Sequence, residues 1–217
     1  WREVDMHDID VFVDQQRAGG LKPATVRRRV AALKTFFDFM AEESGDLSWP
    51  NPVRFKRHAG RQEKRVPRDL HDDDIERVWQ KISSSRDRAW FALMVRAGLR
   101  VGEVVDLKLR DILNKPEGER PAHIRAYGKG RKERIVLLSA DAYAVLSVWL
   151  SERGESPLGY IFLNEHRQQL SVNGIEWLLK GYGREAGLHL TPHQLRHTYA
   201  RQLTEAGMPI TSLGKLM

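Results

Sequence analysis

One stretch of this chain lacks the apolar spacing of a helix or a strand, and it divides the sequence into two parts. Residues 54–68 contain seven Lys or Arg, one Glu and no apolar repeat. A basic stretch of this kind is typical of a linker. The sequence therefore predicts an N-terminal domain over residues 1–55, a basic linker over 56–68 and a second domain over 69–217.

The part before the linker predicts two helices, the second with one basic side. Residues 5–16 carry apolar side chains on one face, and from residue 25 onward a longer apolar stripe recurs at helical spacing. Residues 17–37 contain six Lys or Arg and no acid. This is either a solvated basic face or a helix laid against a DNA backbone, and the one-sided charge favours DNA. The candidate DNA contacts here and in the linker are Arg27, Arg28, Lys34, Arg57 and Arg61.

The part after the linker predicts more helices and a small sheet. Helical spacing begins near residue 72 and returns at residues 86–97, 140–152 and 172–184. Segments 107–110, 122–127 and 133–138 predict three strands, and 160–163 predicts a further short one. The expected fold class is mostly α with a small antiparallel β-sheet (α+β).

The charge balance indicates a polyanionic partner. The 217 residues include 36 Lys or Arg and 29 Asp or Glu, a surplus of seven positive charges. Nucleic acid is the first candidate and an anionic membrane the second. The longest apolar run, which includes residues 90–95, is too short to span a bilayer. Cys is absent, which excludes disulfides and thiolate metal sites and fits a reducing, cytoplasmic setting.

Residues 97–103 predict a tight junction between two helices. Gly98 suits the position just after a helix, where the backbone turns left-handed. Arg100 then falls on the junction itself, where the backbone aims the side chain closely. It is either an ordinary Arg that closes a turn or a positioned cation.

A second basic feature is the hairpin turn expected at residues 128–132, between two predicted strands. Its cations are Lys129, Arg131 and Lys132. They are either solubilising turn residues or contacts to a phosphate backbone. Lys129 could also donate a proton to a phosphate oxygen.

Residues 191–198 predict a helix start that carries a titratable group beside a permanent cation. Thr191 suits the N-cap and Pro192 the first turn. His193 and Arg196 lie three residues apart and share one helix face. Such a pair near a helix N-terminus favours an anion, with phosphate first. Two other interpretations stay open at this point: a solvated surface pair, or half of a metal site formed by His193 and His197.

Together these segments resemble the tyrosine recombinases, the family of the phage integrases. Residues 97–103 look like the family's first signature box, residues 128–134 like the hairpin with its catalytic lysine, and residues 192–197 like its His-x-x-Arg box. The three occur in the family's order and in matching predicted structure. The resemblance implies an N-terminal helical core-binding domain and a catalytic domain, which together cover nearly the whole chain.

The resemblance also implies a mechanism and assigns roles to single residues. In the family, a tyrosine attacks a DNA phosphate and gives a 3′-phosphotyrosine and a free 5′-hydroxyl, with no cofactor and no metal. Arg100 and Arg196 would clamp the phosphate oxygens, Lys129 would protonate the departing oxygen, and His193 would manage the nucleophile's proton. Glu103 would support the turn at Arg100.

The nucleophile itself is not found among the recognised segments. The family places it roughly 30 residues after the His-x-x-Arg box, beyond Met217. The expectation is therefore a C-terminally incomplete catalytic domain that binds DNA and does not cleave it. The expected partner is double-stranded DNA at a specific recombination site, bound by a dimer or tetramer without a membrane, in a prokaryotic or phage-type setting.

Two other functions fit the same residues. A type IB topoisomerase shares the chemistry, although the basic N-terminal helical domain favours a recombinase. A catalytically silent DNA-binding protein is the other, but binding alone does not require Arg100, Lys129, His193 and Arg196 together. A membrane-surface protein fits least, because no predicted helix pairs a basic face with an exposed aromatic one.

Overall fold

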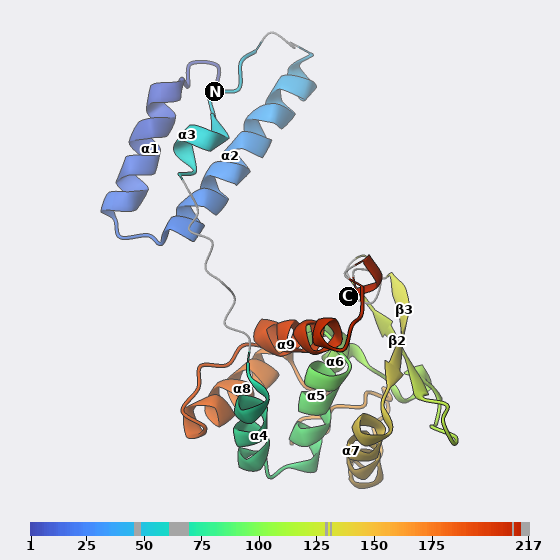
Figure 1. Ribbon diagram of the computed structural model, residues 1–217. Helices are drawn as coiled ribbons and strands as arrows, with labels where there is room; N and C mark the ends of the chain where they lie inside the picture. The colour runs from blue at the N-terminus through green and yellow to red at the C-terminus, as the bar shows by residue number, and fades with distance from the viewer. Residues whose placement is uncertain (46–48, 61–69, 129, 131, 210, 214–217) are drawn as a thin grey trace. The chain divides into compact units, whose positions relative to one another are not determined.

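The computed structural model describes residues 1–45, 49–60, 70–128, 130, 132–209 and 211–213 (Figure 1). The chain forms two compact units, Trp1–Val66 and Pro67–Met217. Each unit has its own apolar core. No helix in the described ranges is long and apolar enough to cross a membrane.

The first unit is built on two long helices, α1 (Met6–Ala18) and α2 (Pro23–Ser44), which pack side by side (Figure 1). Asp5 caps α1 by accepting the amides of His7 and Asp8. Pro23 opens α2, where its fixed φ suits the first turn. The core between them is the apolar stripe that the sequence predicted, with Ile9, Val13, Val26, Val30 and Phe37 buried.

A short helix, α3 (Phe55–His58), forms where the sequence predicted the start of the linker. The predicted linker therefore begins too early. Phe55 packs against the core of the first unit, and His58 and Ala59 are buried. Two apolar residues among the cations are enough to dock one helical turn, which a charge count does not reveal. Residues 61–69 lie outside the described residues. They include the rest of the predicted linker and the candidate DNA contact Arg61.

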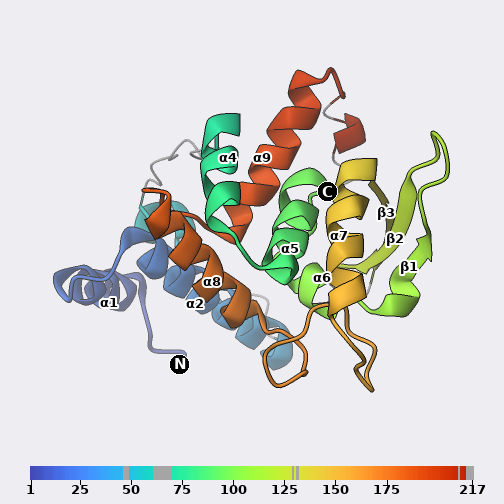
Figure 2. The same ribbon diagram turned by 90° about the horizontal axis from the view of Figure 1, so that it is seen from below.

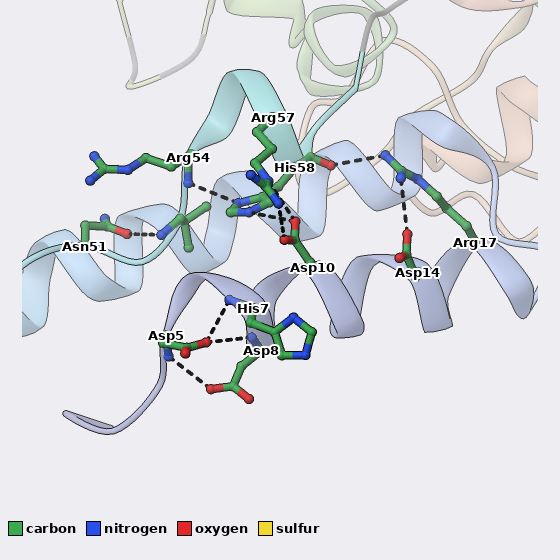
Figure 3. Close-up of polar contacts among 11 residues, drawn as sticks. Asp5, His7, Asp8, Asp10, Asp14, Arg17, Asn51, Arg54, Arg57 and His58 are labelled. Carbon is green, nitrogen blue, oxygen red and sulfur yellow. Dashed lines mark hydrogen bonds and ion pairs between the residues drawn. The ribbon is translucent and has the colours of Figure 1, made fainter.

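A polar network joins α3 to α1 (Figure 3). Asp10 accepts hydrogen bonds from Arg57 Nε at 3.1 Å and from Arg57 Nη2 at 2.6 Å. The imidazole of His58 lies beside this pair, with Nε2 3.2 Å from Asp10 Oδ1. Its Nδ1 accepts the Arg54 amide at 3.0 Å, so the neutral ring carries its proton on Nε2. Burial lowers the pKa of His58 and outweighs the opposing effect of Asp10.

Acidification from pH 7 to pH 5 is expected to weaken the protection of the Arg54 amide against hydrogen exchange. Because the pKa of His58 is lowered in the folded unit, its stabilising contribution is complete above the ordinary value of 6.5. It is lost as the pH falls through the lower folded value, when protonation of Nδ1 removes the acceptor of the Arg54 amide. The measurement is amide exchange by NMR, corrected for the intrinsic effect of pH.

The Val53 amide is the matched control, because it donates to Asn51 Oδ1 at 2.8 Å and that acceptor does not titrate. Its protection should stay constant over the same range. Equal losses at both amides would point to general opening of the unit and contradict a role for His58.

In its described residues the second unit has six α-helices, and a small sheet lies at one side of them (Figures 1 and 2). They are α4 (Asp72–Lys81), α5 (Ser85–Arg96), α6 (Val101–Asp106), α7 (Ala140–Glu152), α8 (Val172–Glu185) and α9 (Pro192–Glu205). Helix α5 is almost wholly buried and packs against both α7 and α9 (Figure 2). The predicted fold class, mostly helical with a small antiparallel sheet, is confirmed.

The sheet has the order β1 (Ile112–Asn114), β2 (Ala122–Tyr127) and β3 (Glu133–Leu138), all antiparallel. Helix α7 lies along β3 (Figure 2). The prediction of a strand at residues 107–110 is wrong. Residues Leu109–Asp111 form a turn of 3-10 helix, because the buried Asp111 accepts the Lys108 amide at 2.9 Å and bends the chain. The predicted strand at residues 160–163 is likewise reduced to isolated bridges at Tyr160 and Leu163.

Candidate active site

The candidate site begins at the junction between α5 and α6. Gly98 has a φ of +63°, which turns the chain just after α5, as the sequence predicted. Arg100 follows as the N-cap residue of α6. Its side chain remains 51% exposed, so the junction presents a guanidinium at the surface.

A buried carboxylate, Glu103, holds this junction together. Its side chain is only 2% exposed. Glu103 Oε2 accepts the Arg100 amide at 2.8 Å, and Oε1 accepts Arg100 Nη1 at 3.0 Å. The structure thus confirms that Glu103 supports the turn at Arg100.

Two more arginines reach the same carboxylate from distant parts of the chain. Arg134 on β3 donates from Nη2 to Glu103 Oε2 at 2.8 Å. Arg196 on α9 places Nη1 4.0 Å from the same oxygen. Burial alone would raise the pKa of Glu103, but hydrogen bonds from Arg134 and the Arg100 amide outweigh it and lower that pKa. The carboxylate is therefore ionised and partly offsets three positive charges.

Arg196 is fixed more firmly than Arg100. Helix α9 starts as predicted, with Thr191 accepting the Gln194 amide and Pro192 in the first turn. The Arg196 side chain is 6% exposed and donates from Nη1 to the carbonyl of Gly98. Burial, with smaller effects from Arg100 and Arg134, lowers the pKa of Arg196 to about 10. Arg196 thus remains charged at neutral pH, and its guanidinium can interact with an anion.

His193 lies one turn before Arg196 on α9 and is exposed. Its ring packs edge-on against His197, with centroids 4.3 Å apart. Desolvation, with smaller effects from His197, Arg196 and Arg100, lowers the pKa of His193. At neutral pH the ring is therefore neutral and has a nitrogen free to accept a proton. In the described ranges no third ligand joins the two histidines in a group that could hold a metal ion.

The base of the β2–β3 hairpin lies beside Arg100 and Glu103. A Cβ atom built on Gly128 would lie 3.7 Å from Glu103 Oε1 and 3.9 Å from Arg100 Nη1. The Gly128 amide donates to the Lys132 carbonyl at 2.8 Å and closes the hairpin, and Lys132 is exposed. The predicted residues Lys129 and Arg131 lie outside the described residues, so only the base of their hairpin is located.

Arg134 is the residue of this cluster that sequence reasoning did not single out. A signal was present in the alternation of β3, where Val136 and Leu138 are buried and Arg134 occupies the same side. An arginine on the inner side of a strand requires a buried acid, and Glu103 is that acid.

The candidate DNA contacts of the first unit differ in how many contacts their side chains make within the protein. Arg27 donates to the Gly60 carbonyl at 3.1 Å and lies over the ring of Phe55. Lys34 pairs with Asp38 at 2.6 Å, and Arg57 pairs with Asp10. Arg28 is exposed on α2. Of these four, the structure gives Arg28 the side chain with the fewest internal contacts.

Gly98→Ala is expected to destabilise the second unit by about 1–3 kcal/mol. The positive φ disfavours any side chain, and a Cβ atom at this position would overlap the ring of Tyr199. Because the Gly98 carbonyl accepts Arg196, the shift should also loosen that guanidinium. Urea denaturation measures the loss.

Gly118→Ala is the matched control for this variant. Gly118 has a φ of +55°, and nothing lies within 4 Å of an added Cβ atom, so this variant measures backbone strain alone. Equal losses at both positions would show that the Tyr199 contact contributes nothing at Gly98.

The comparisons with known proteins agree with this geometry. Residues 68–217 match the model of the phage integrase family. The chain is 32% identical to tyrosine recombinase XerD of Listeria innocua over 227 residues, which cover 99% of this chain and 74% of the relative. It is 27% identical to tyrosine recombinase XerC of Bacillus subtilis, over 100% of this chain and 73% of the relative.

Solved structures share the fold. A XerH site-specific recombinase bound to a palindromic difH substrate matches with a TM-score of 0.81 and 22% identity, over 98% of this chain and 65% of that one. A lambda integrase dimer bound to a core site matches with a TM-score of 0.77 and 21% identity, over 99% and 78%. At these identities the likeness concerns the fold alone.

Proposed function

The chain belongs to the phage integrase family, and from this premise we propose that it acts in site-specific DNA recombination. In this proposal it is part of an enzyme that cuts and rejoins DNA strands through a 3′-phosphotyrosyl intermediate. The observation that carries the proposal is the buried carboxylate of Glu103, which gathers Arg100, Arg134 and Arg196 in one place. The relatives are named tyrosine recombinases, and the similar folds include recombinases bound to DNA.

Arg100 and Arg196 bind the non-bridging oxygens of the phosphate to be attacked. A guanidinium presents two parallel N–H donors that match such oxygens. Glu103 holds Arg100, and the Gly98 carbonyl holds Arg196, so neither donor has to be reorganised during the reaction. Donors fixed in this way stabilise the charge that develops at the phosphorus in the transition state.

His193 and Lys129 move the protons. The nucleophile's oxygen forms a bond to phosphorus while the bond from phosphorus to the 5′ oxygen breaks. His193, neutral because its pKa is lowered, accepts the nucleophile's proton. Lys129 protonates the departing oxygen and leaves a free 5′-hydroxyl. The position of Gly128 beside Arg100 supports this role for the residue that follows it.

Rejoining reverses these transfers. The 5′-hydroxyl of a partner strand attacks the phosphotyrosyl bond, which has kept the energy of the original phosphodiester. The proposed cycle therefore consumes no cofactor.

The proposal assigns the nucleophile to none of the five tyrosines in the printed sequence, so this chain by itself binds DNA without cleaving it. Tyr199 lies near Arg134 and Arg196, but its ring packs against Gly98, and burial raises its pKa and disfavours the phenolate. Tyr182 donates its hydroxyl to Asp87 Oδ2 at 2.7 Å. Tyr160 lies beneath the ammonium of Lys108.

The proposed partner is double-stranded DNA at a specific recombination site, bound by two or four copies of the protein. Lambda integrase is described as a dimer on a core site and as a tetramer on a Holliday junction. The helical unit Trp1–Val66 is proposed to bind DNA as a core-binding domain, with Arg28 as an exposed phosphate contact. On the second unit, Lys132 at the hairpin base is a further contact.

The deciding experiment uses the protein as its gene encodes it and a nicked duplex that carries its binding site, selected beforehand from random duplexes. We expect a covalent protein–DNA adduct on a tyrosine outside residues 1–217. Lys129→Ala should form no adduct on ordinary DNA. It should form the adduct on DNA with a 5′-bridging sulfur, because a thiolate leaves without a proton.

Other outcomes would identify the two competing functions. Relaxation of supercoiled DNA without exchange between two sites would indicate a type IB topoisomerase. Tight, site-specific binding with no adduct would indicate a silent DNA-binding protein and overturn the proposed reaction.

A further inference from the structure

A second concave surface lies along residues 177–184 of α8. It is a pocket of about 590 Å³ between this helix and the segment that leads into α9. Trp177 is one of the lining residues and is 71% exposed. The other lining residues are Lys180, Arg184, Gly187, Leu188, His189 and Leu190.

The nitrogen-bearing side chains around this pocket are not engaged elsewhere. Within the described ranges, no hydrogen bond or ion pair occupies the side chains of Lys180, Arg184 or His189. Glu176 lies four residues before Lys180, a spacing that commonly gives a helical ion pair, yet the two do not pair. By contrast, Arg201 on α9 is bound to both Asp72 and Glu205. The charges at the pocket are therefore available to an anion.

An exposed indole beside unpaired cations defines the chemistry of the ligand. The flat face of Trp offers a stacking surface for another planar ring, and Lys and Arg bind phosphate oxygens. A nucleotide combines a planar base with an adjacent phosphate. The base must be unpaired, because base faces inside a duplex are already covered by their neighbours.

We propose that the Trp177 pocket binds an unpaired nucleotide of single-stranded DNA, with the base on Trp177 and its phosphate on Lys180 and Arg184. The inference rests on the proposed function, because strand exchange unpairs nucleotides next to the cut. The pocket is continuous in the chain with the candidate active site. Residues 187–190 line it and lead directly into α9, which carries His193 and Arg196.

The test measures binding of a fluorescent eight-nucleotide oligothymidylate to the full chain by anisotropy. Trp177→Ala should weaken binding by roughly 5- to 150-fold, the range that one base–aromatic stack contributes. Trp177→Phe should retain most of the affinity, because phenylalanine still stacks. Trp1→Ala is the matched control, since Trp1 is equally exposed at 71% but lies in the first unit.

The phosphate contact is tested by charge removal. Lys180→Ala should weaken oligothymidylate binding and reduce its salt dependence by about one counterion. Lys115→Ala removes the same charge from the exposed connection between β1 and β2 and should change neither.

Two results would overturn the inference. An unchanged affinity in Trp177→Ala would remove the stacking role. If Trp177→Ala weakened binding of an abasic oligonucleotide as much as binding of oligothymidylate, no base would be held on Trp177. Strong competition by an acidic peptide with an aromatic residue would then assign the pocket to a protein partner. Because Trp177 is exposed, the variant should keep the circular dichroism of the parent protein.

Failure of this inference is separable from failure of the proposed function. Duplex binding and adduct formation depend on Arg100 and Arg196 and should be unaffected in Trp177→Ala within about twofold. If Trp177→Ala cleaved DNA normally and bound oligothymidylate with unchanged affinity, only the proposed nucleotide site would be rejected, and the proposed function would stand.

Discussion

Arg196→Lys is expected to slow DNA strand cleavage by about 10²–10³-fold while DNA affinity changes little. A lysine keeps one positive charge but loses the planar pair of donors that can face a phosphate. It would also lose charge more readily. The surroundings that lower the pKa of Arg196 to about 10 would act on an ammonium whose ordinary pKa is already only about 10.4.

The measurement is single-turnover adduct formation on the nicked duplex, with the protein as its gene encodes it. Arg110→Lys is the control, because it makes the same exchange at an exposed position in the turn Leu109–Asp111, to which no role is assigned, and it should leave the cleavage rate unchanged. If Arg196→Lys lowered affinity and left the rate of cleavage intact, Arg196 would be a binding residue only, and the assigned transition-state role would be wrong.

Glu103→Ala is expected to destabilise the second unit by about 3–5 kcal/mol, the usual cost of removing one partner from a buried ion pair. The carboxylate is 2% exposed and its loss would leave Arg134 and Arg196 facing each other without a counter-charge. The Arg100 amide would lose its acceptor as well. Urea denaturation, followed by tryptophan fluorescence to which the buried Trp90 contributes, measures the change.

Two further variants show what part of this loss is due to charge. Glu103→Gln keeps the shape and one oxygen acceptor, so it should cost less than the alanine variant while still disturbing the arginines. Glu165→Ala removes a carboxylate that is 85% exposed beside His166, where an ion pair contributes little. A loss at Glu103 no larger than the loss at Glu165 would contradict the central position given to this carboxylate.

Local elements of the fold were predictable because their signals are local. The apolar spacing of residues 140–152 gave the bounds of α7, and the alternation in residues 122–127 and 133–138 gave those of β2 and β3. The prediction failed at residues 107–110, because the side chain of Asp111 bends that segment into a turn. A period of two does not reveal such a competing hydrogen bond.

The candidate site was predictable in its parts and not in its assembly. Sequence placed Arg100 on a tight junction and put His193 and Arg196 on one helix. It did not show that Arg196 is buried against the carbonyl of Gly98, because that contact joins residues 98 positions apart. Arg134 was missed for the same reason, since its partner lies on another element.

The carboxylate of Glu103, which three arginines share, has a consequence for the stage of folding at which the protein could cleave DNA. Glu103 holds Arg100 within the same helix junction, whereas Arg134 on β3 and Arg196 on α9 reach this carboxylate only once their own elements have docked. A chain still emerging from the ribosome, or one partly opened by heat, cannot present two fixed guanidiniums to one phosphate. The proposed strand cleavage therefore requires a completely folded second unit, and a partly synthesised or partly unfolded copy is not expected to break DNA.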